Sequence, residues 1–228
     1  MKAYDLCVKT KEIGKTIEIA KKLGFNGLGL IIPYGRDFEK TKTKILKETK
    51  DAGMDIVIGV EIQGKTNGIK RVAKKIRKKH VLLVAKGGNI ELNRAIAETK
   101  EIDILSSPLL ENNKPGINHI IARFAAKNNV AIDFALSPVI NSSKKTRSEI
   151  VSAMLEDARF VKKYKAPFVI TSNALSPWDL RAPSEFMAFG RFLGLPENKI
   201  KKTVSGEILK ENRKRLSGKW LMPGVEVE

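Results

Sequence analysis

The sequence has very little cysteine or glutamine and no long apolar run. Cys7 is the only cysteine, so no disulfide forms within the chain, and a reducing compartment is expected. Gln63 is the only glutamine, and depletion of both residue types is typical of heat-adapted proteins. No apolar run approaches the ~20 residues of a membrane span, and the N-terminus lacks the apolar core of a signal peptide. These absences predict a cytoplasmic protein of a thermophile with no membrane partner.

Histidine is scarce as well, which restricts the chemistry open to the chain. His80 and His119 are the only two, and neither belongs to an H-x-H or H-E-x-x-H motif. Because hydrolytic metal centres need several converging His, Asp or Glu ligands, we expect no metal and no cofactor. His119 shares a predicted helix with Ile120 and Phe124 and is expected to be packed or hydrogen-bonded there. Cys7 lies in an apolar run and is expected to be a core residue, so no catalytic residue is predicted.

Acidic residues are too few to balance the basic ones. The chain has 43 Lys and Arg against 25 Asp and Glu, which gives a net charge of +18. A lysine-rich thermophile surface explains part of this excess, but such surfaces usually balance lysine with glutamate. An unbalanced positive charge favours a polyanionic partner, above all a nucleic acid.

Strand-like and helix-like runs alternate along nearly the whole chain. Short apolar runs closed by glycine, proline or polar residues predict seven strands and a weaker eighth, at 4–8, 27–32, 55–62, 81–85, 102–105, 130–136, 167–171 and 200–204. Helical spacing of apolar residues predicts helices between and after them, at 13–23, 38–52, 68–79, 87–98, 116–128, 145–164, 183–193 and 207–216. This alternation predicts an α/β fold, a TIM-like (β/α) barrel of seven to eight strands with helices outside. We expect a single domain over residues 1–228, with an irregular tail at 218–228.

The carboxyl ends of the strands form the working face of such a barrel. The residues there are rich in hydroxyl groups and cations, and Glu61 is the only acid squarely among them. They are Lys9, Thr10, Tyr34, Arg36, Glu61, Gln63, Lys86, Gly87, Ser106, Ser107, Ser137, Ser172, Asn173, Ser205 and Gly206. The turn Gly87-Gly88-Asn89 opens a predicted helix and offers backbone N–H groups to a phosphate, although such turns also serve purely conformational ends.

Three basic segments stand out from the rest of the chain. Residues 65–80 hold eight cations and no acid, so the helix predicted there repels itself unless phosphates relieve the repulsion. A second segment spans 201–219, and a third, Lys144, Lys145 and Arg147, opens a helix, where cations oppose the helix dipole. Aromatic residues make up 6% of the chain and do not alternate with the cations. Recognition of the nucleic-acid backbone and shape is therefore expected, rather than stacking on splayed bases.

Several short segments, in this order and spacing, resemble a known family over nearly the whole chain. They are Tyr4-Asp5-Leu6-Cys7-Val8, Gly24-Phe25, Asn118-His119, Ile132-Asp133-Phe134, Ser172-Asn173-Ala174 and Asp179-Leu180-Arg181-Ala182-Pro183. The family is that of archaeal ribonuclease P protein component 3, the counterpart of the thirty-kilodalton protein subunit of eukaryotic ribonuclease P. The resemblance implies a barrel related to the polymerase-and-histidinol-phosphatase group of metal hydrolases, but without the metal ligands. Asp5-Leu6-Cys7 stands where those hydrolases carry H-x-H.

The same resemblance implies the function and the partners. The chain would be a protein subunit of the endoribonuclease that removes 5′ leaders from precursor tRNA, in which the RNA is the catalyst. It would bind ribonuclease P RNA and a Pop-five-like protein subunit, contact other ribonuclease P proteins indirectly, and support folding of the catalytic RNA. The isolated chain is expected to be inactive.

Eight residues are predicted to contact RNA. Arg181 comes from the matched loop, and charge and placement add Lys86, Arg36, Lys144, Lys145, Arg147, Lys74 and Lys78. Two other functions stay open from the residues alone. The glycine-rich turn and the serine-rich face also fit a barrel hydrolase or isomerase that acts on a phosphorylated small molecule. A partner-binding module, whose basic patches only keep it soluble, is the third possibility.

Overall fold

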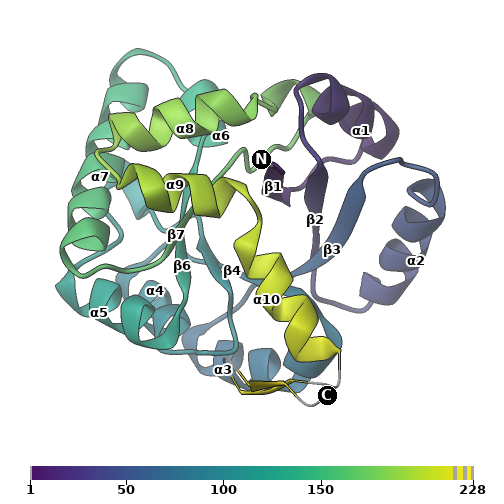
Figure 1. The fold of residues 1–228 in the computed structure, drawn as a ribbon. Coiled ribbons are helices and arrows are strands. Elements are labelled where there is room, and N and C mark those ends of the chain that lie inside the picture. The colour runs from purple at the N-terminus through teal and green to yellow at the C-terminus, as the bar shows by residue number, and fades with distance from the viewer. Residues whose placement is uncertain (1, 218–219, 223–224, 227–228) are drawn as a thin grey trace.

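Seven parallel strands form a nearly closed barrel, and each strand pairs with the next one along the chain (Figure 1). The structure, a computed structural model, describes residues 2–217, 220–222 and 225–226. The strands are β1 (Tyr4–Val8), β2 (Gly27–Pro33), β3 (Asp55–Ile62), β4 (Leu82–Lys86), β5 (Ile104–Ser106), β6 (Ala131–Ala135) and β7 (Phe168–Thr171). Across the seam, Val8 bridges to Ala174, and the Lys9 N–H donates to the Ala174 carbonyl at 2.7 Å. The predicted α/β barrel is confirmed.

Helices surround the barrel, where α1 to α7 connect successive strands and α8 to α10 follow the last one. They are α1 (Ile13–Lys22), α2 (Phe38–Glu48), α3 (Thr66–Ile76), α4 (Ile90–Ala97), α5 (His119–Asn128), α6 (Ser137–Ile140), α7 (Lys144–Lys163), α8 (Pro183–Phe192), α9 (Glu197–Val204) and α10 (Glu207–Leu216). Short 3₁₀ turns lie at η1 (Arg77–Lys79), η2 (Glu111–Asn113) and η3 (Pro177–Asp179). Among the residues described, no helix has the length and apolar character needed to cross a membrane.

Most strands are buried on both faces, as expected for parallel strands between a barrel interior and a helical layer. Successive side chains of a strand point to opposite sides, so each strand contributes to two cores. In β2, Leu28 and Leu30 pack with the helices in the main hydrophobic cluster. Ile31 belongs instead to the smaller interior cluster, together with Val57 of β3 and Leu82 of β4.

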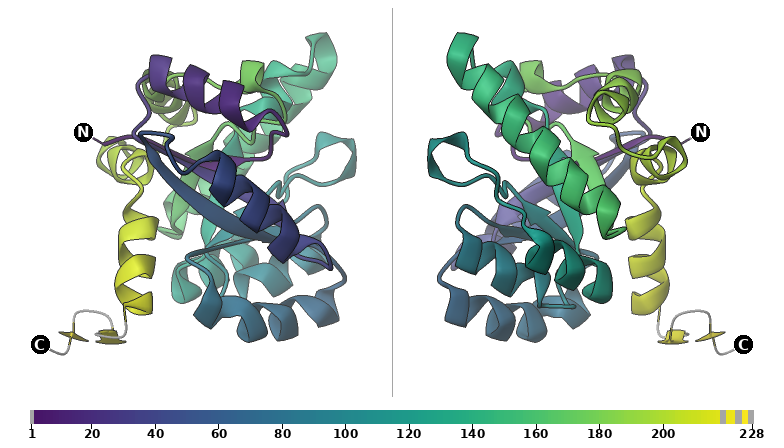
Figure 2. Two further views of the ribbon diagram at one scale, coloured as in Figure 1. Left: turned by 90° about the vertical axis from the view of Figure 1, so that its right-hand side faces the viewer. Right: turned by 90° about the vertical axis from the view of Figure 1, so that its left-hand side faces the viewer.

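Helix α10 closes the amino end of the barrel. Its Leu209 is buried in the interior cluster, and Figure 2 shows the helix across the side where the strands begin. Asn212 donates to the carbonyl of Val81, just before β4, at 2.8 Å. Arg213 forms a two-pronged ion pair with Asp55, the first residue of β3, at 2.7 and 2.8 Å. The amino end is therefore covered by the chain itself, and the carboxyl end is left as the mouth.

The predicted eighth strand at 200–204 is wrong, because these residues are the last turns of α9. Ile200 and Val204 are spaced four residues apart on one helical face, and both are buried. Within the tail at 218–228, where no element is predicted, two short strands pair antiparallel, β8 (Trp220–Met222) and β9 (Val225–Glu226). Strands of two and three residues are too short to leave a sequence pattern, and the other tail residues lie outside the described ones.

Candidate nucleic-acid interface

The mouth of the barrel holds a buried ion pair. Lys9 directly follows β1, and its Nζ lies 2.5 Å from Oε1 of Glu61 on β3, with both side chains largely buried. The side-chain amide of Gln63 donates a hydrogen bond to the other oxygen of Glu61. The acid predicted at the strand ends is thus neutralised by a neighbouring cation.

Asp5 on β1 adds a second carboxyl group, and it is fully buried. It accepts hydrogen bonds from the backbone N–H groups of Cys7 at 3.3 Å and of Ser172 at 3.2 Å. Burial raises the pKa of Asp5 to about 7, although these hydrogen bonds oppose the rise. Because Ser172 directly follows β7, Asp5 ties the first strand to the last across the seam.

Asp133 on β6 is the third buried carboxyl group of the mouth. It accepts hydrogen bonds from the hydroxyl groups of Thr171 at 2.8 Å and Ser106 at 3.2 Å. Burial raises the pKa of Asp133 to about 6. These contacts join β5, β6 and β7. They also engage the hydroxyl groups of Ser106 and Thr171, which are then not free to bind a ligand. The arrangement is typical of a polar core that holds strands together rather than of an open reaction centre.

Both aspartates stand in segments that resemble the family, but neither is among the predicted site residues, which lie at or beyond the ends of the apolar runs. Asp5 and Asp133 lie inside those runs. The signal that finds them is the presence of an acid within an apolar strand, since a buried carboxyl group needs hydrogen-bonding partners.

The remaining candidate groups for catalysis are scattered. Among residues 2–217 and the described parts of the tail, no three His, Cys, Asp or Glu side chains are grouped so that they could hold a metal ion. Cys7 is a core residue, as predicted, and burial raises the pKa of its thiol well above the usual value. His80 shortly precedes β4, and the centre of its ring lies 5.2 Å from that of Phe38. His119 is exposed, not packed as expected, because it is the first residue of α5 and its side chain faces solvent.

The glycine-rich turn before α4 is occupied by contacts within the chain. The Gly87 N–H donates to the Ser106 carbonyl at 2.8 Å, and the Gly88 N–H donates to Oδ1 of Asn93 at 3.0 Å. Asn89 caps the helix by accepting the Leu92 N–H at 2.8 Å. Gly88 also has a φ of +136°, which strongly favours glycine. The backbone conformation of the turn therefore explains its glycines. Because the N–H groups of Gly87 and Gly88 are already bonded within the chain, a phosphate site there has less support.

Three of the predicted RNA contacts surround the mouth. Lys86 is the exposed last residue of β4, and Arg36 is exposed in the turn between β2 and α2. Arg181 lies between η3 and α8, where its guanidinium donates to the carbonyls of Trp178 at 2.9 Å and Leu180 at 2.7 Å. These two bonds fix the direction of the guanidinium while the side chain stays partly exposed.

The basic cluster of Lys144, Lys145 and Arg147 lies on the same end of the molecule, because α6 and the start of α7 follow β6 (Figure 2). Arg147 donates from Nε to the Ser142 carbonyl at 2.9 Å and so caps the turn after α6. Lys145 pairs loosely with Glu149, one helical turn later, at 3.8 Å. Exposed pairs of this kind contribute little and exchange readily for a phosphate.

Comparison with known proteins decides the family. Residues 2–217 match the family model described as RNase P subunit p30. The chain belongs to this family. Among its curated relatives, Ribonuclease P protein component 3 of Methanococcoides burtonii is 32% identical over 98% of this chain and 93% of its own length. Its namesake in Methanothermobacter thermautotrophicus is 30% identical over 90% and 86%.

Solved structures agree with membership of the RNase P subunit p30 family. A chain of the cryo-EM structure of archaeal Ribonuclease P with mature tRNA superposes with a TM-score of 0.82 at 25% identity, over 98% of this chain and 96% of that one. The A. niger ochratoxinase superposes with a TM-score of 0.54 at 9% identity, over 90% and 70%. The second likeness concerns the fold alone.

The p30-family chain places its longest basic segment away from the mouth. Lys74 and Lys78 are exposed on α3 and η1, on the outside of the barrel, and are not brought together with Arg181. Arg77, another cation of this segment, is buried and forms a two-pronged ion pair with Asp103 at 2.6 and 2.8 Å. The segment therefore does not consist only of unpaired cations, because an acid 26 positions later in the sequence balances one of them.

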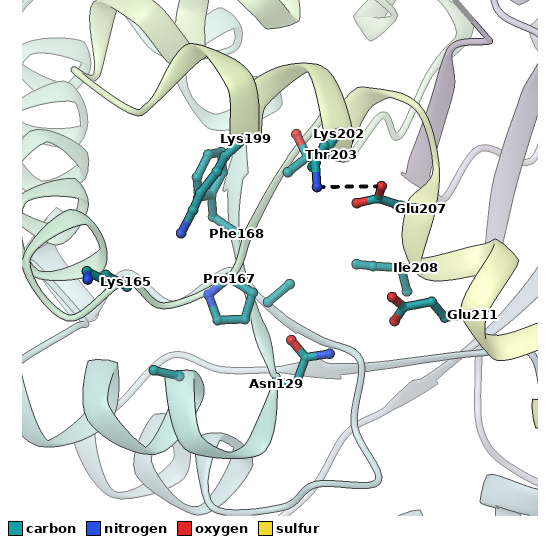
Figure 3. A pocket seen from close by; sticks show the side chains of 12 residues that line it. Asn129, Lys165, Pro167, Phe168, Lys199, Lys202, Thr203, Glu207, Ile208 and Glu211 are labelled. Atoms are coloured by element: carbon teal, nitrogen blue, oxygen red, sulfur yellow. Dashed lines mark ion pairs between the residues drawn. The ribbon is translucent and has the colours of Figure 1, made fainter. Parts of the chain in front are cut away.

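A hollow of about 310 Å³ lies at the other end of this p30-family barrel, between the start of β7 and helices α9 and α10 (Figure 3). Lys165, Lys199 and Lys202 line one part of it, and Glu207 and Glu211 line another. Lys202 and Glu207 are 4.0 Å apart. Because charges of both signs meet there, the hollow has no clear preference for an anion, and none of the predicted contacts lies in it.

Proposed function

We propose that this p30-family chain is a protein subunit of cytoplasmic ribonuclease P, that it binds the catalytic RNA through the carboxyl end of its barrel, and that it does not itself catalyse cleavage. The observation that carries the proposal is the family match over residues 2–217. A Pop-five-like subunit is the proposed protein partner, as the family implies. The single cysteine is consistent with a reducing compartment.

The chemistry of the mouth supports a role in binding rather than in cleavage. Asp5 and Asp133 are buried and hydrogen-bonded to neighbouring strands, and Glu61 is paired with Lys9. None of these acids is free to activate water. Exposed cations such as Lys86 surround them, and exposed cations bind phosphates while releasing counterions.

A barrel hydrolase acting on a phosphorylated small molecule has less support. Its best candidate site, the turn at Gly87 and Gly88, donates its N–H groups within the chain. The strand-end hydroxyl of Ser106 is engaged by Asp133.

Reconstitution of the holoenzyme tests the proposal. Precursor-tRNA cleavage is measured with the RNA and the other protein subunits, with and without this chain, and with the chain alone. We expect cleavage to fall when the chain is omitted, because its RNA contacts are lost, and we expect the chain alone to give no turnover. Unchanged cleavage on omission, or repeated phosphoester hydrolysis by the isolated chain, would contradict the proposal.

Charge reversals test the placement of the RNA contacts. Arg181→Glu, and the combined reversal of Lys144, Lys145 and Arg147, should each weaken RNA binding and slow cleavage by roughly tenfold or more at moderate salt. Lys47→Glu on α2 is the matched control for Arg181→Glu, because it makes the same change in charge on the outside of the barrel. If the control and the mouth variants behave alike, the contacts lie elsewhere even if the subunit role is correct.

A further inference from the structure

The loop between β7 and α8 holds two apolar side chains out in solvent. Leu175 is 65% exposed and Trp178 is 67% exposed. The backbone that carries them is fixed, because the Asp179 carboxylate accepts the N–H groups of Leu175 and Ser176, both at 3.0 Å. Ser176 in turn accepts the Trp178 N–H at 3.2 Å. A rigid backbone that holds an indole side chain in solvent is typical of a surface that binds a partner, because the backbone loses little conformational entropy on binding.

Two cations lie beside this loop, and a neighbouring connection leads to a basic cluster. Lys15 of α1 has its Nζ 4.6 Å from the centre of the Trp178 ring, and Figure 1 shows the β7–α8 segment beside α1. Arg181 is held against the Trp178 carbonyl at 2.9 Å. On the other side, Asn141 donates to the Asp179 carboxylate at 3.3 Å, which places the α6–α7 connection against the loop. That connection leads directly into the basic cluster of Lys144, Lys145 and Arg147.

Several acids near these cations are engaged by other groups, and Glu18, on α1 with Lys15, pairs with Lys22 at 2.6 Å. Glu185, the acid nearest in sequence after Asp179, is engaged at the start of α8, where it accepts the Ala182 N–H at 2.7 Å. Glu12 lies at the start of α1 and is exposed. The loop thus presents a flat apolar group beside the cations Lys15 and Arg181. An unpaired nucleotide supplies the complement to both, because its base stacks on an aromatic ring and its phosphates meet cations.

We propose that Trp178 stacks on an unpaired base of the bound RNA, with Lys15 and Arg181 against the flanking phosphates. The inference rests on the proposed RNA-binding function and adds a mode of recognition to it. Sequence order predicts no stacking, because aromatic residues do not alternate with cations along the chain. The fold overrides that expectation by bringing α1 and η3 together at one end of the barrel.

Fluorescence of Trp178 provides a direct test. Trp178 and Trp220 are the two tryptophans, so a Trp220→Phe chain reports on Trp178 alone. The probes are a single-stranded oligouridylate and a fully paired RNA duplex of similar length. Stacking predicts that the oligouridylate quenches the fluorescence at saturation and that the duplex, which offers no splayed base, does not. Equal quenching by both, or none by either at saturation, overturns the proposal.

Substitutions separate stacking from charge. Trp178→Ala should weaken oligouridylate binding about tenfold. Trp178→Phe should keep most of the wild-type affinity, and Trp178→Leu should bind as weakly as Trp178→Ala. The salt dependence of binding should stay the same in all three, because no phosphate contact is removed. Phe192→Ala is the matched control, an aromatic residue 58% exposed at the far end of α8, and should bind like wild type.

The outcomes distinguish this inference from the function it rests on. If Trp178→Ala binds as wild type while Arg181→Glu does not, stacking is wrong and the RNA-binding role stands. If Trp178→Leu keeps wild-type affinity, the contact is apolar burial and stacking is again wrong. If Trp178→Ala binds RNA normally but no longer joins the protein partner in a pull-down, the loop is a protein interface. A wild-type chain that binds neither RNA probe nor ribonuclease P RNA removes the proposed function as well.

Discussion

Single buried carboxyl groups set part of the response of the protein to pH. The pKa values of Asp5 and Asp157 are raised to about 7, and that of Asp133 to about 6, chiefly by burial. Their ordinary value is 3.8. In the window between these values, the folded chain holds protons that the unfolded chain has released. Their contribution to stability is therefore fully present below pH 3.8 and is lost as pH rises through 6 and 7.

Asp5→Asn should remove one part of this dependence. The amide keeps an oxygen to accept the Ser172 N–H but no longer titrates. The free energy of unfolding, from urea titrations at pH values between about 4 and 8, should fall less steeply with pH than in wild type. Asp55 and His80, whose pKa values are lowered, act in the opposite direction in both proteins, so the difference between the two curves is the measurement. Asp51→Asn, at an exposed turn, is the control. Parallel curves for Asp5→Asn and wild type would contradict the assignment.

Among single residues, the sequence identified those at strand ends better than those within strands. Glu61 and Lys86 were found because each follows an apolar run. Asp133 was not, because its role depends on Ser106 and Thr171, which lie 27 and 38 positions away in sequence. A local sequence pattern cannot indicate partners that are so far away along the chain.

Among the helices, α10 contributes a buried polar side chain that its amphipathic pattern does not predict. Its buried Asn212 accepts a hydrogen bond from Arg77 at 2.9 Å and donates to Asp103 at 2.9 Å. It also donates to the carbonyl of Val81 at 2.8 Å. The helix thus completes a buried polar network that joins η1, β4 and β5 at the amino end. Nε of Arg77 is buried there without a hydrogen-bond partner among the described residues, so the network tolerates the loss of a further contact poorly.

Asn212→Ala should therefore cost far more than its size suggests. Removal of the amide leaves the Val81 carbonyl and part of the Arg77–Asp103 pair without a partner in a buried place. We expect the free energy of unfolding to fall by about 2–4 kcal/mol, measured by urea or thermal unfolding. Asn198→Ala on the exposed face of α9 is the control and should change stability by less than about 0.5 kcal/mol. A loss at Asn212 no larger than that of the control would show that α10 is only packed against the barrel.

Most helices and strands were predictable because their patterns are long enough to be distinctive. The segment at 200–204 was not, since Ile200 and Val204 fit a short apolar strand as well as one face of a helix. Pro196, directly before α9, is the cue that favours the helix, because proline suits a helix start. Seven strands rather than eight close the barrel through the single bridge at Val8 and Ala174.

Across the whole molecule, the net charge of +18 indicated a polyanion but not where it binds. The fold divides the predicted contacts between two places. Arg181 and Lys86 surround the open mouth, and Lys74 lies on the outside near the end that α10 covers. If both places touch RNA, the RNA extends from the mouth over the flank of the barrel. Composition alone could not reveal this, because it depends on the direction in which each helix runs.

The salt dependence of binding to ribonuclease P RNA can show how many phosphate contacts each of these two places makes. Each lost phosphate contact should flatten the slope of log K against log salt by ~0.7–0.9. Neutralising Lys144, Lys145 and Arg147 to alanine should therefore reduce the slope by about 2–3, and the pair Lys74→Ala and Lys78→Ala by about 1.5. The control is a pair of exposed lysines on α2, Lys44→Ala and Lys47→Ala, for which no RNA contact is proposed. A slope unchanged by Lys74 and Lys78 would confine the RNA to the mouth, and a slope unchanged by the first cluster would remove the mouth from the interface.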